Sequence, residues 1–311
     1  MTATLGANTA DAPVSFGEVW AYHLAGEAKL FDPSMGITDL ASFGAGLNSS
    51  GELVGIPSVE VVKGFKGRRH LVVEIQENYA LAHMALFPDF TVREALISAL
   101  VKACQGFDGL QLDFESVSSR DKDHFWSFLK ELKSQIGDRV LSVAVPARTS
   151  VVDDAYDYRV LNNLVDRVVI MAYDEHWSGS VPGSVASLDW CRRVAAFAQG
   201  TLAPEKIVMG APFYGRAWTD KSLARAYKFS ALAKIMDEKV VNQARDDGIP
   251  HFEYEELVKV RVFYEDRSSQ LARLTQYASL GVRNVAFWRL GQEDPSVWSA
   301  LVRVEAEPAG P

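Results

Sequence analysis

The feature that most constrains the fold is a regular alternation of short apolar runs with amphipathic helical stretches, from near Phe16 to near Val304. This alternation is typical of parallel βαβ units, and runs that are apolar throughout are typical of strands buried on both faces. Eight candidate strands lie near residues 17–23, 39–45, 70–76, 108–115, 139–145, 166–173, 206–213 and 283–289. Eight parallel strands predict the α/β fold class, as a closed (β/α)8 TIM barrel, and a chain of 311 residues suits one such domain.

Helices are predicted between the strands, for example over 91–104, 119–136 and 270–280, where apolar residues recur at helical spacing. The interval 219–267, between the seventh and eighth strands, is too long for one connecting loop. It contains a helical stretch near 230–245 and short strands near 252–254 and 258–264. We therefore expect a small α+β insertion in the barrel.

The termini carry little information about fold or location. We expect residues 1–15 to form a flexible leader, 16–304 the barrel domain and 305–311 a flexible tail. The leader is rich in Ala and Thr and lacks the apolar and basic parts of a signal peptide, so we expect secretion or a cell-envelope location only if a signal was trimmed, and the cytoplasm otherwise. No apolar run is long enough to span a membrane. We expect a monomer.

Charge and cysteine content exclude several classes of function. The formal net charge is −8 with no basic run, which argues against nucleic acid as a partner and favours a neutral or weakly charged ligand. Cys104 and Cys191 are the only cysteines, and no C-x-x-C motif or His/Cys cluster accompanies them. We expect buried thiols, no disulfide, no metal site and no cofactor.

The fourth predicted strand places polar side chains on one face of an otherwise apolar segment. Gln111, Asp113 and Glu115 share that face, and the residues between them are apolar. Two carboxyl groups this close couple their titrations, so one keeps its proton near neutral pH while the other ionises. Cleavage of a glycosidic bond requires that division of roles. An arbitrary D-x-E is more often an exposed pair or a salt-bridged sheet end, but the apolar neighbours here favour a functional site.

Further polar and aromatic residues stand at other strand ends, where barrel enzymes carry their chemistry. They are Tyr22 and His23 on the first strand, Tyr173 and Asp174 on the sixth, Tyr214 and Arg216 after the seventh, and Trp288 on the eighth.

Taken together, these motifs resemble those of glycoside hydrolase family 18, which includes chitinases and endo-β-N-acetylglucosaminidases. The family's fourth strand reads D-G-x-D-x-D-x-E, matched by residues 108–115, and its sixth reads M-x-Y-D, matched by 171–174. The resemblance covers about 16–300, and segments 173–179 and 287–294 are most similar to the bacterial branch of spore-cortex-lytic N-acetylglucosaminidases.

The chain departs from typical chitinases at two places. Gln111 stands where they have the first aspartate of a triad. A glutamine can hydrogen-bond Asp113 but cannot share its charge, so Asp113 is expected to have one anionic neighbour fewer. The third strand, 73–78, lacks the chitinase sequence S-x-G-G, which alters the wall of the sugar pocket.

The resemblance implies a retaining hydrolase of β-linked N-acetylglucosamine glycans, either chitooligosaccharide-like or peptidoglycan-like, in which the substrate's 2-acetamido oxygen is the nucleophile. Glu115 would be the general acid and then the base, Asp113 would orient the acetamido group, and Tyr173 would hold its carbonyl. Trp288 would form the pocket floor. For Tyr173 and Trp288 the alternative is ordinary core packing.

Other expected substrate-binding residues are Tyr22, Gln111, Asp174, Tyr214, Arg216, His176 and Trp177. Arg216 can equally pair with Asp174 or Glu293 as a structural ion pair. His176 and Trp177 either cover the leaving-group side of the cleft or clamp their own loop. Trp190 is expected on a helix facing the barrel.

Two other functions compete with the hydrolase. The first is a catalytically silent, sugar-binding barrel of the same family. Its members usually lack the glutamic acid that this chain has as Glu115, which favours the enzyme. The second is a barrel enzyme acting on a phosphorylated metabolite, but no glycine-rich phosphate loop follows the segment 210–215.

Overall fold

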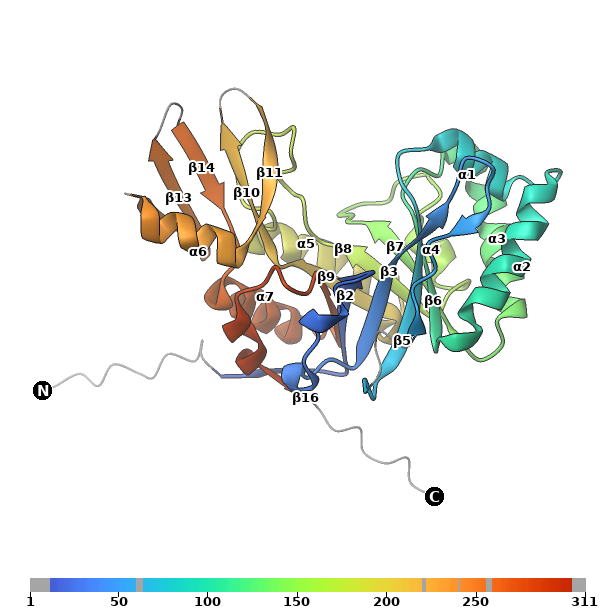
Figure 1. Cartoon of the computed structure of the whole chain (residues 1–311), viewed down its shortest axis with the longest axis horizontal. Coiled ribbons are helices and arrows are strands. Elements are labelled where there is room, and N and C mark those ends of the chain that lie inside the picture. The colour runs from blue at the N-terminus through green and yellow to red at the C-terminus, as the bar shows by residue number, and fades with distance from the viewer. Residues whose placement is uncertain (1–11, 60–63, 220–221, 240, 256–258, 304–311) are drawn as a thin grey trace, which may run out of the picture.

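The computed structural model describes residues 12–59, 64–219, 222–239, 241–255 and 259–303, and it contains a closed barrel of eight parallel strands (Figure 1). The barrel closes because β2 pairs with both β15 and β3. This confirms the predicted fold class. The barrel strands are β2 (Glu18–Leu24), β3 (Asp39–Leu47), β5 (Arg68–Ile75), β6 (Gly109–Phe114), β7 (Val140–Pro146), β8 (Arg167–Met171), β9 (Ile207–Pro212) and β15 (Asn284–Trp288). The short β4 (Leu53–Val54) pairs antiparallel with β3.

Helices cover the outside of the barrel, and the first turn of the predicted helix 119–136 is a separate 3-10 segment. The α-helices outside the insertion are α1 (Tyr79–Leu86), α2 (Thr91–Ala103), α3 (Lys122–Gln135), α4 (Tyr158–Leu161), α5 (Leu188–Gln199) and α7 (Arg267–Ser279). Short 3-10 helices span Ala28–Leu30, Pro33–Met35, Cys104–Gly106, Ser119–Asp121, Pro204–Lys206 and Pro295–Ala300.

The two faces of β6 have different surroundings, as its alternating sequence predicts. Leu110, Leu112 and Phe114 are fully buried in the main core, which also contains apolar residues of the covering helices. Gln111 and Asp113 face the barrel interior instead. The strand therefore delivers its carboxylate row to the inside of the barrel while its apolar row anchors it to the helices.

The amino-terminal end of the barrel interior holds charges that are paired. Asp39 accepts hydrogen bonds of 2.7 Å from both Arg68 and His70, and Arg167 pairs with Glu18. Burial opposes the ionisation of Asp39, but the bonds from His70 and Arg68 outweigh it and hold its pKa below the usual value. These pairs stabilise the floor of the barrel, opposite the strand ends where chemistry is expected.

The insertion between β9 and β15 is a five-stranded antiparallel sheet with one helix, and it stands beside the mouth of the barrel (Figure 1). This confirms the predicted α+β insertion. It begins earlier than residue 219, because β10 already leaves the barrel to pair with β11 and β14. Its elements are β10 (Tyr214–Thr219), β11 (Ser222–Lys228), α6 (Phe229–Glu238), β12 (Asn242–Asp246), β13 (Ile249–Glu255) and β14 (Lys259–Phe263).

The predicted helix 230–245 is wrong in its second half. Helix α6 ends at Glu238, and residues Asn242–Asp246 form β12, which pairs with β13. The reason lies in the Asp247-Gly248 turn, where both residues have positive φ, 47° and 80°. An Asp-Gly pair in that conformation is a strong hairpin signal, and it outweighs the helical spacing before it.

The described part of the N-terminus is ordered differently from the expected leader. Residues Val14–Phe16 form β1, which pairs in parallel with β16 (Leu301–Arg303). The expected leader therefore extends too far, while residues 1–11 and the tail 305–311 lie outside the described residues. Cys104 and Cys191 are buried and unpaired, as predicted. Within the described ranges, no helix is long and apolar enough to cross a membrane.

Candidate active site

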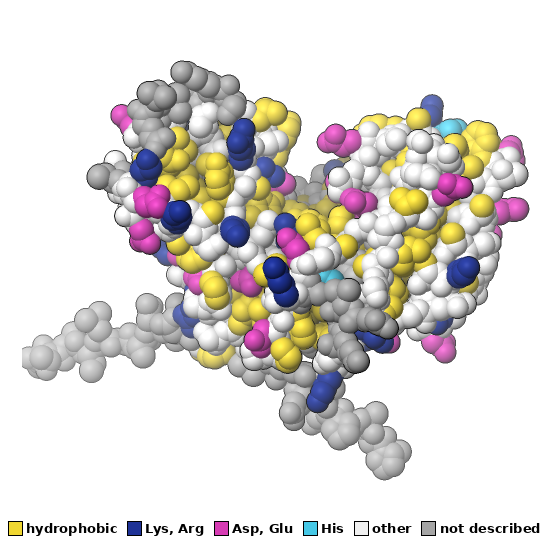
Figure 2. All heavy atoms as spheres, in the orientation of Figure 1, with side chains coloured by type: hydrophobic (Ala, Val, Ile, Leu, Met, Phe, Trp, Pro, Cys, Tyr) yellow, Lys and Arg dark blue, Asp and Glu magenta, His cyan; other side chains and the backbone are white. Residues whose placement is uncertain are grey.

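A cleft of about 510 Å³ opens at the carboxyl ends of the barrel strands. Figure 2 shows the molecule hollowed between the insertion and the side of the barrel that carries α1, α2 and α3. Of the expected site residues, seven line it: Asp113, Glu115, Tyr173, Asp174, Tyr214, Arg216 and Trp288. They come from β6, β8, β10, β15 and the loops that follow them, so residues far apart in sequence meet at one end of the barrel.

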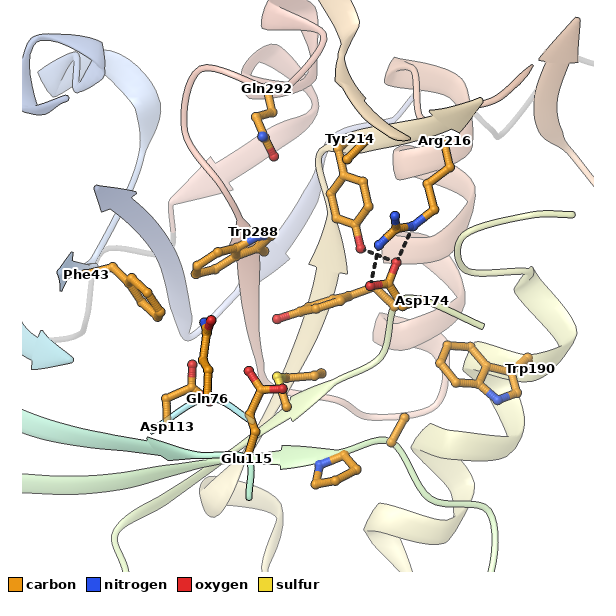
Figure 3. A pocket seen from close by; sticks show the side chains of 15 residues that line it. Phe43, Gln76, Asp113, Glu115, Asp174, Trp190, Tyr214, Arg216, Trp288 and Gln292 are labelled. Carbon is orange, nitrogen blue, oxygen red and sulfur yellow. Dashed lines mark hydrogen bonds and ion pairs between the residues drawn. The ribbon is translucent and has the colours of Figure 1, made fainter. Parts of the chain in front are cut away.

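Two carboxyl groups point into the cleft from β6 and the residue after it (Figure 3). Asp113 is 7% exposed, and its burial, with the negative charges of Glu115 and Glu74, raises its pKa to about 8. Loss of solvation in the cleft raises the pKa of Glu115 as well, and Glu77 and Asp174 add to the shift. The site therefore retains protons on its carboxyl groups closer to neutral pH than ordinary carboxylates do.

A hydrogen bond between Gln111 and Asp113, which the sequence allows, does not form. Gln111 Oε1 instead accepts a 2.9 Å bond from the hydroxyl of Tyr22, across the barrel interior. The amide nitrogen of Gln111 and Oδ1 of Asp113 are buried and have no hydrogen-bond partner among the described residues. Gln111 is thus held by β2 rather than by its neighbour on β6.

Tyr173 lines the cleft just after β8 (Arg167–Met171). Burial is the main reason that the pKa of its hydroxyl lies well above the usual value, so the hydroxyl stays protonated and can donate. A glycine in β9 leaves space for the ring, because a Cβ at Gly210 would lie 3.1 Å from Cε1 of Tyr173. The position therefore supplies one hydrogen-bond donor to the cleft.

Asp174, Tyr214 and Arg216 form one network on the cleft wall (Figure 3). Arg216 donates two hydrogen bonds to the Asp174 carboxylate, of 2.9 and 2.8 Å, and the Tyr214 hydroxyl donates a third of 2.6 Å. Of the two partners expected for Arg216, the structure has Asp174; Glu293 instead accepts a bond from Trp298. The fork-to-carboxylate geometry holds the loop after β8 against the insertion.

Trp288 ends β15 in the middle of the cleft (Figure 3). Its ring lies edge-on to Phe43 at 4.9 Å and tilted to Tyr22 at 5.4 Å, both distances joining ring centroids. A cis peptide bond links it to Arg289. Aromatic contacts on two sides fix the indole while it still lines the open cleft.

Four expected binding residues do not line the cleft. Tyr22 and Gln111 are 5% and 1% exposed and lie beneath the site. The ring of His176 bonds at 2.8 Å to the carbonyl of Ser184, so it clamps its own loop. Trp177 is 56% exposed on the same loop, outside the cleft lining.

Several lining residues are missing from the sequence-based set. They are Phe43, Gln76, Pro146, Ala147, Met171, Trp190, Ala226 and Gln292. Five of these stand in or just after a barrel strand, so reading every strand end, rather than only those with motifs, would have found them. Trp190, expected only as a barrel-facing helix residue, also borders the cleft from the first turn of α5 (Figure 3).

The site has no evident metal ligands. Within the ranges that the structure describes, no group of three or more His, Cys, Asp or Glu side chains could hold a metal ion.

Comparison with known proteins gives consistent results. The family model described as glycosyl hydrolases family 18 matches residues 86–293. A cortical fragment-lytic enzyme of Bacillus anthracis is 27% identical over 231 residues, which are 69% of this chain and 54% of that protein. The chain thus spans about half the length of such curated relatives.

Solved structures share the fold. The spore cortex-lytic enzyme SleL of Bacillus cereus superposes with a TM-score of 0.84 at 23% identity, over 94% of this chain and 76% of that one. A chitinase variant from Cycas revoluta, solved in complex with (GlcNAc)4, superposes with a TM-score of 0.75 at 20% identity, over 90% of this chain and 97% of that one.

Proposed function

This chain belongs to the glycosyl hydrolases of family 18, and from that membership we propose that it cleaves β-linked glycans containing N-acetylglucosamine, with retention of configuration and with the substrate's own 2-acetamido oxygen as nucleophile. The observation that carries the proposal is that three groups line one cleft: Glu115 with a raised pKa, a second carboxyl group from Asp113, and the protonated hydroxyl of Tyr173. The indole of Trp288 lines the same cleft.

Glu115 is the general acid of the proposed reaction. It gives its proton to the oxygen of the leaving sugar while the bond between that oxygen and the anomeric carbon breaks. The resulting carboxylate then takes a proton from the water that attacks the anomeric carbon. The raised pKa of Glu115 supports this role, because an acid catalyst has to be protonated at the working pH.

Asp113 and Tyr173 act on the acetamido group. The acetamido oxygen bonds to the anomeric carbon to give a cyclic oxazolinium ion, and opening of that ring by water restores the acetamide. Asp113 accepts a hydrogen bond from the acetamido N–H and offsets the positive charge of the oxazolinium ring. The Tyr173 hydroxyl donates a hydrogen bond to the acetamido oxygen and so aligns it for attack. Both residues line the cleft, Asp113 from β6 and Tyr173 from just after β8, as two-sided positioning requires.

Trp288 gives the sugar its floor. A pyranose ring presents C–H groups on its faces, and these pack on an aromatic plane such as the indole that lines the cleft. The one cation among the lining residues, Arg216, is already paired with Asp174. That pairing favours a neutral or weakly charged glycan, either chitooligosaccharide-like or a peptidoglycan-type chain.

A panel of chitooligosaccharides, N-glycans and peptidoglycan fragments tests the proposal, with products identified by mass spectrometry and the anomer of the first product by NMR. We expect cleavage of at least one substrate, with the β-anomer formed first. A thiazoline analogue of N-acetylglucosamine should inhibit, and the matched substrate without its N-acetyl group should not react. Hydrolysis of a plain glucoside at a comparable rate would instead require a nucleophile from the protein. Binding of the glycans without cleavage would identify the silent sugar-binding barrel.

A further inference from the structure

Glu74 lies beside Asp113 on the neighbouring strand. In the parallel pair β5–β6, Glu74 is in register with Asp113, and two residues earlier Val72 is in register with Gln111. Register partners on parallel strands point to the same face, at a strand spacing of about 4.8 Å. Val72 belongs to the apolar cluster inside the barrel, so Glu74 also faces the interior, one layer nearer the cleft.

The next strand leaves space for this glutamate. Gly46 of β3 is in register with Glu74 on the side opposite Asp113. A Cβ on Gly46 would lie 3.5 Å from Cγ of Glu74, an ordinary contact distance, so the Glu74 side chain lies directly beside this glycine. Gly46 of β3, Glu74 of β5 and Asp113 of β6 are therefore neighbours in one row across the sheet, with the two carboxyl groups next to each other.

Neither carboxyl group has a partner that would favour its ionisation. Glu74 Oε2 and Asp113 Oδ1 are buried and have no hydrogen-bond partner among the described residues. No ion pair formed by those residues includes either one. The titratable groups that interact with Asp113 and Glu74 are acids or phenols: Glu115 with both, and the hydroxyls of Tyr22, Tyr156 and Tyr173 with Asp113. This differs from Asp39 at the other end of the barrel, which has Arg68 and His70.

We propose that Glu74 is a positioning residue that supplies, from β5, the neighbouring carboxyl group that position 111 of β6 lacks, and that Glu74 and Asp113 share one proton. Asp113 is buried and Glu74 is half-buried. Two such neighbouring carboxylates without a cation repel each other, whereas one proton held between them lets one carboxyl group donate a hydrogen bond to the other. Asp113 is then fixed in orientation without Gln111, whose oxygen is bonded to Tyr22. Burial and the charge of Glu115 raise the pKa of Glu74, in agreement.

The inference deepens the proposed function, since it rests on Asp113 as the group that orients the substrate. It makes Glu74 act through Asp113 and not on the sugar, and Glu74 is absent from the cleft lining. It also gives the departure at Gln111 and the departure in the third strand one common explanation: the second carboxyl group has moved to the adjacent strand.

The first experiment measures the shared proton without substrate. Carboxyl 13C NMR titration of the full chain should show the Asp113 midpoint at lower pH in Glu74→Gln than in the parent, because a like charge has been removed. Reciprocally, Asp113→Asn should lower the Glu74 midpoint, which keeps the test available if one variant fails to fold. Glu94→Gln, the same change at an exposed position of α2, is the matched control and should move neither midpoint. Unchanged midpoints in both variants would overturn the proposal.

The second experiment is a rescue. Glu74→Gln should lower kcat about tenfold, equivalent to one pKa unit of lost interaction, with KM within about twofold, and should shift the pH–rate profile. The double variant Glu74→Gln with Gln111→Asp restores a carboxyl group near Asp113, now two residues before it on β6. Its kcat should return to within about threefold of the parent. A double variant no faster than Glu74→Gln would show that Glu74 has only a packing role. A parent inactive on every glycan would contradict the proposed function, while the NMR titration would still decide the proton sharing.

Discussion

Tyr22 donates a 2.9 Å hydrogen bond to Gln111, and this bond joins β2 to β6 directly beneath the cleft. The two residues are 89 positions apart, and both are buried. The amide of Gln111 is therefore part of the support under Asp113 and not part of the surface that meets a glycan.

Gln111→Asp tests what this support does. An aspartate would place another negative charge near Asp113, and like charges raise one of the pKa values in a pair. We expect the acidic limb of kcat/KM to move to higher pH, with activity retained. Profiles of parent and variant that superimpose would show that position 111 is electrostatically silent.

Glu115→Gln tests the acid. Glutamine preserves shape and hydrogen bonding but has no proton to give, so kcat should fall by about 10²–10⁴, with binding largely kept. In the parent, the raised pKa of Glu115 predicts that activity is present below that pKa and is lost as the pH rises through it. The same basic limb should be missing from any residual activity of the variant. Activity within a few fold of the parent would remove Glu115 from the mechanism.

Trp288→Ala removes the floor of the cleft. The loss of one buried aromatic face, about 1.5–3 kcal/mol, should raise KM for a chitooligosaccharide about tenfold or more. Trp288→Phe keeps an aromatic plane, so its KM should lie between those of the parent and of Trp288→Ala. Isothermal titration calorimetry with proteins that also carry Glu115→Gln separates binding from turnover. If the proteins with alanine and with tryptophan at position 288 bound the sugar with equal affinity, the sugar would have to bind elsewhere.

Arg273 of α7 forms a buried ion pair and ties its helix to the segments that precede α7 and α5. It is fully buried and donates to Glu265 at 2.9 and 2.8 Å and to the carbonyl of Ala186 at 2.6 Å. Arg273→Met leaves Glu265 without its cation, and the free energy of unfolding in urea should fall by about 3–5 kcal/mol. Removing an exposed partner in Arg192→Ala should cost less than about 1 kcal/mol. Equal effects would mean that burial does not distinguish the two pairs.

Metal removal provides a further test of the site chemistry. Because the proposed steps use only carboxyl groups, a phenol and the substrate's acetamide, exhaustive EDTA treatment should leave kcat unchanged. A loss of activity that one added divalent ion restores would contradict the proposed mechanism.

The barrel could be predicted because its signals are local. Apolar strands and helical periodicities recur along the chain, and all eight predicted strands are present within a few residues of their expected bounds. The exception is β12, which falls in the second half of the predicted helix 230–245. The helical spacing before it indicated a helix, whereas pairing with β13 makes this segment a strand. The site was found only in part, because Gln76 and Trp190 carry no motif and enter the cleft through their position alone.

Local sequence patterns are enough to specify the alternation that makes a barrel and the row of side chains that β6 turns inward, because a strand's period of two assigns each residue to a face whatever its neighbours are. The groups that surround that row depend instead on how the strands pair in the folded barrel. Strand register sets Glu74 beside Asp113, and barrel closure brings Tyr22 to Gln111 and Trp288 to Tyr22. Such pairings join residues tens to hundreds of positions apart, and they arise from how the sheet closes rather than from any local preference of the chain.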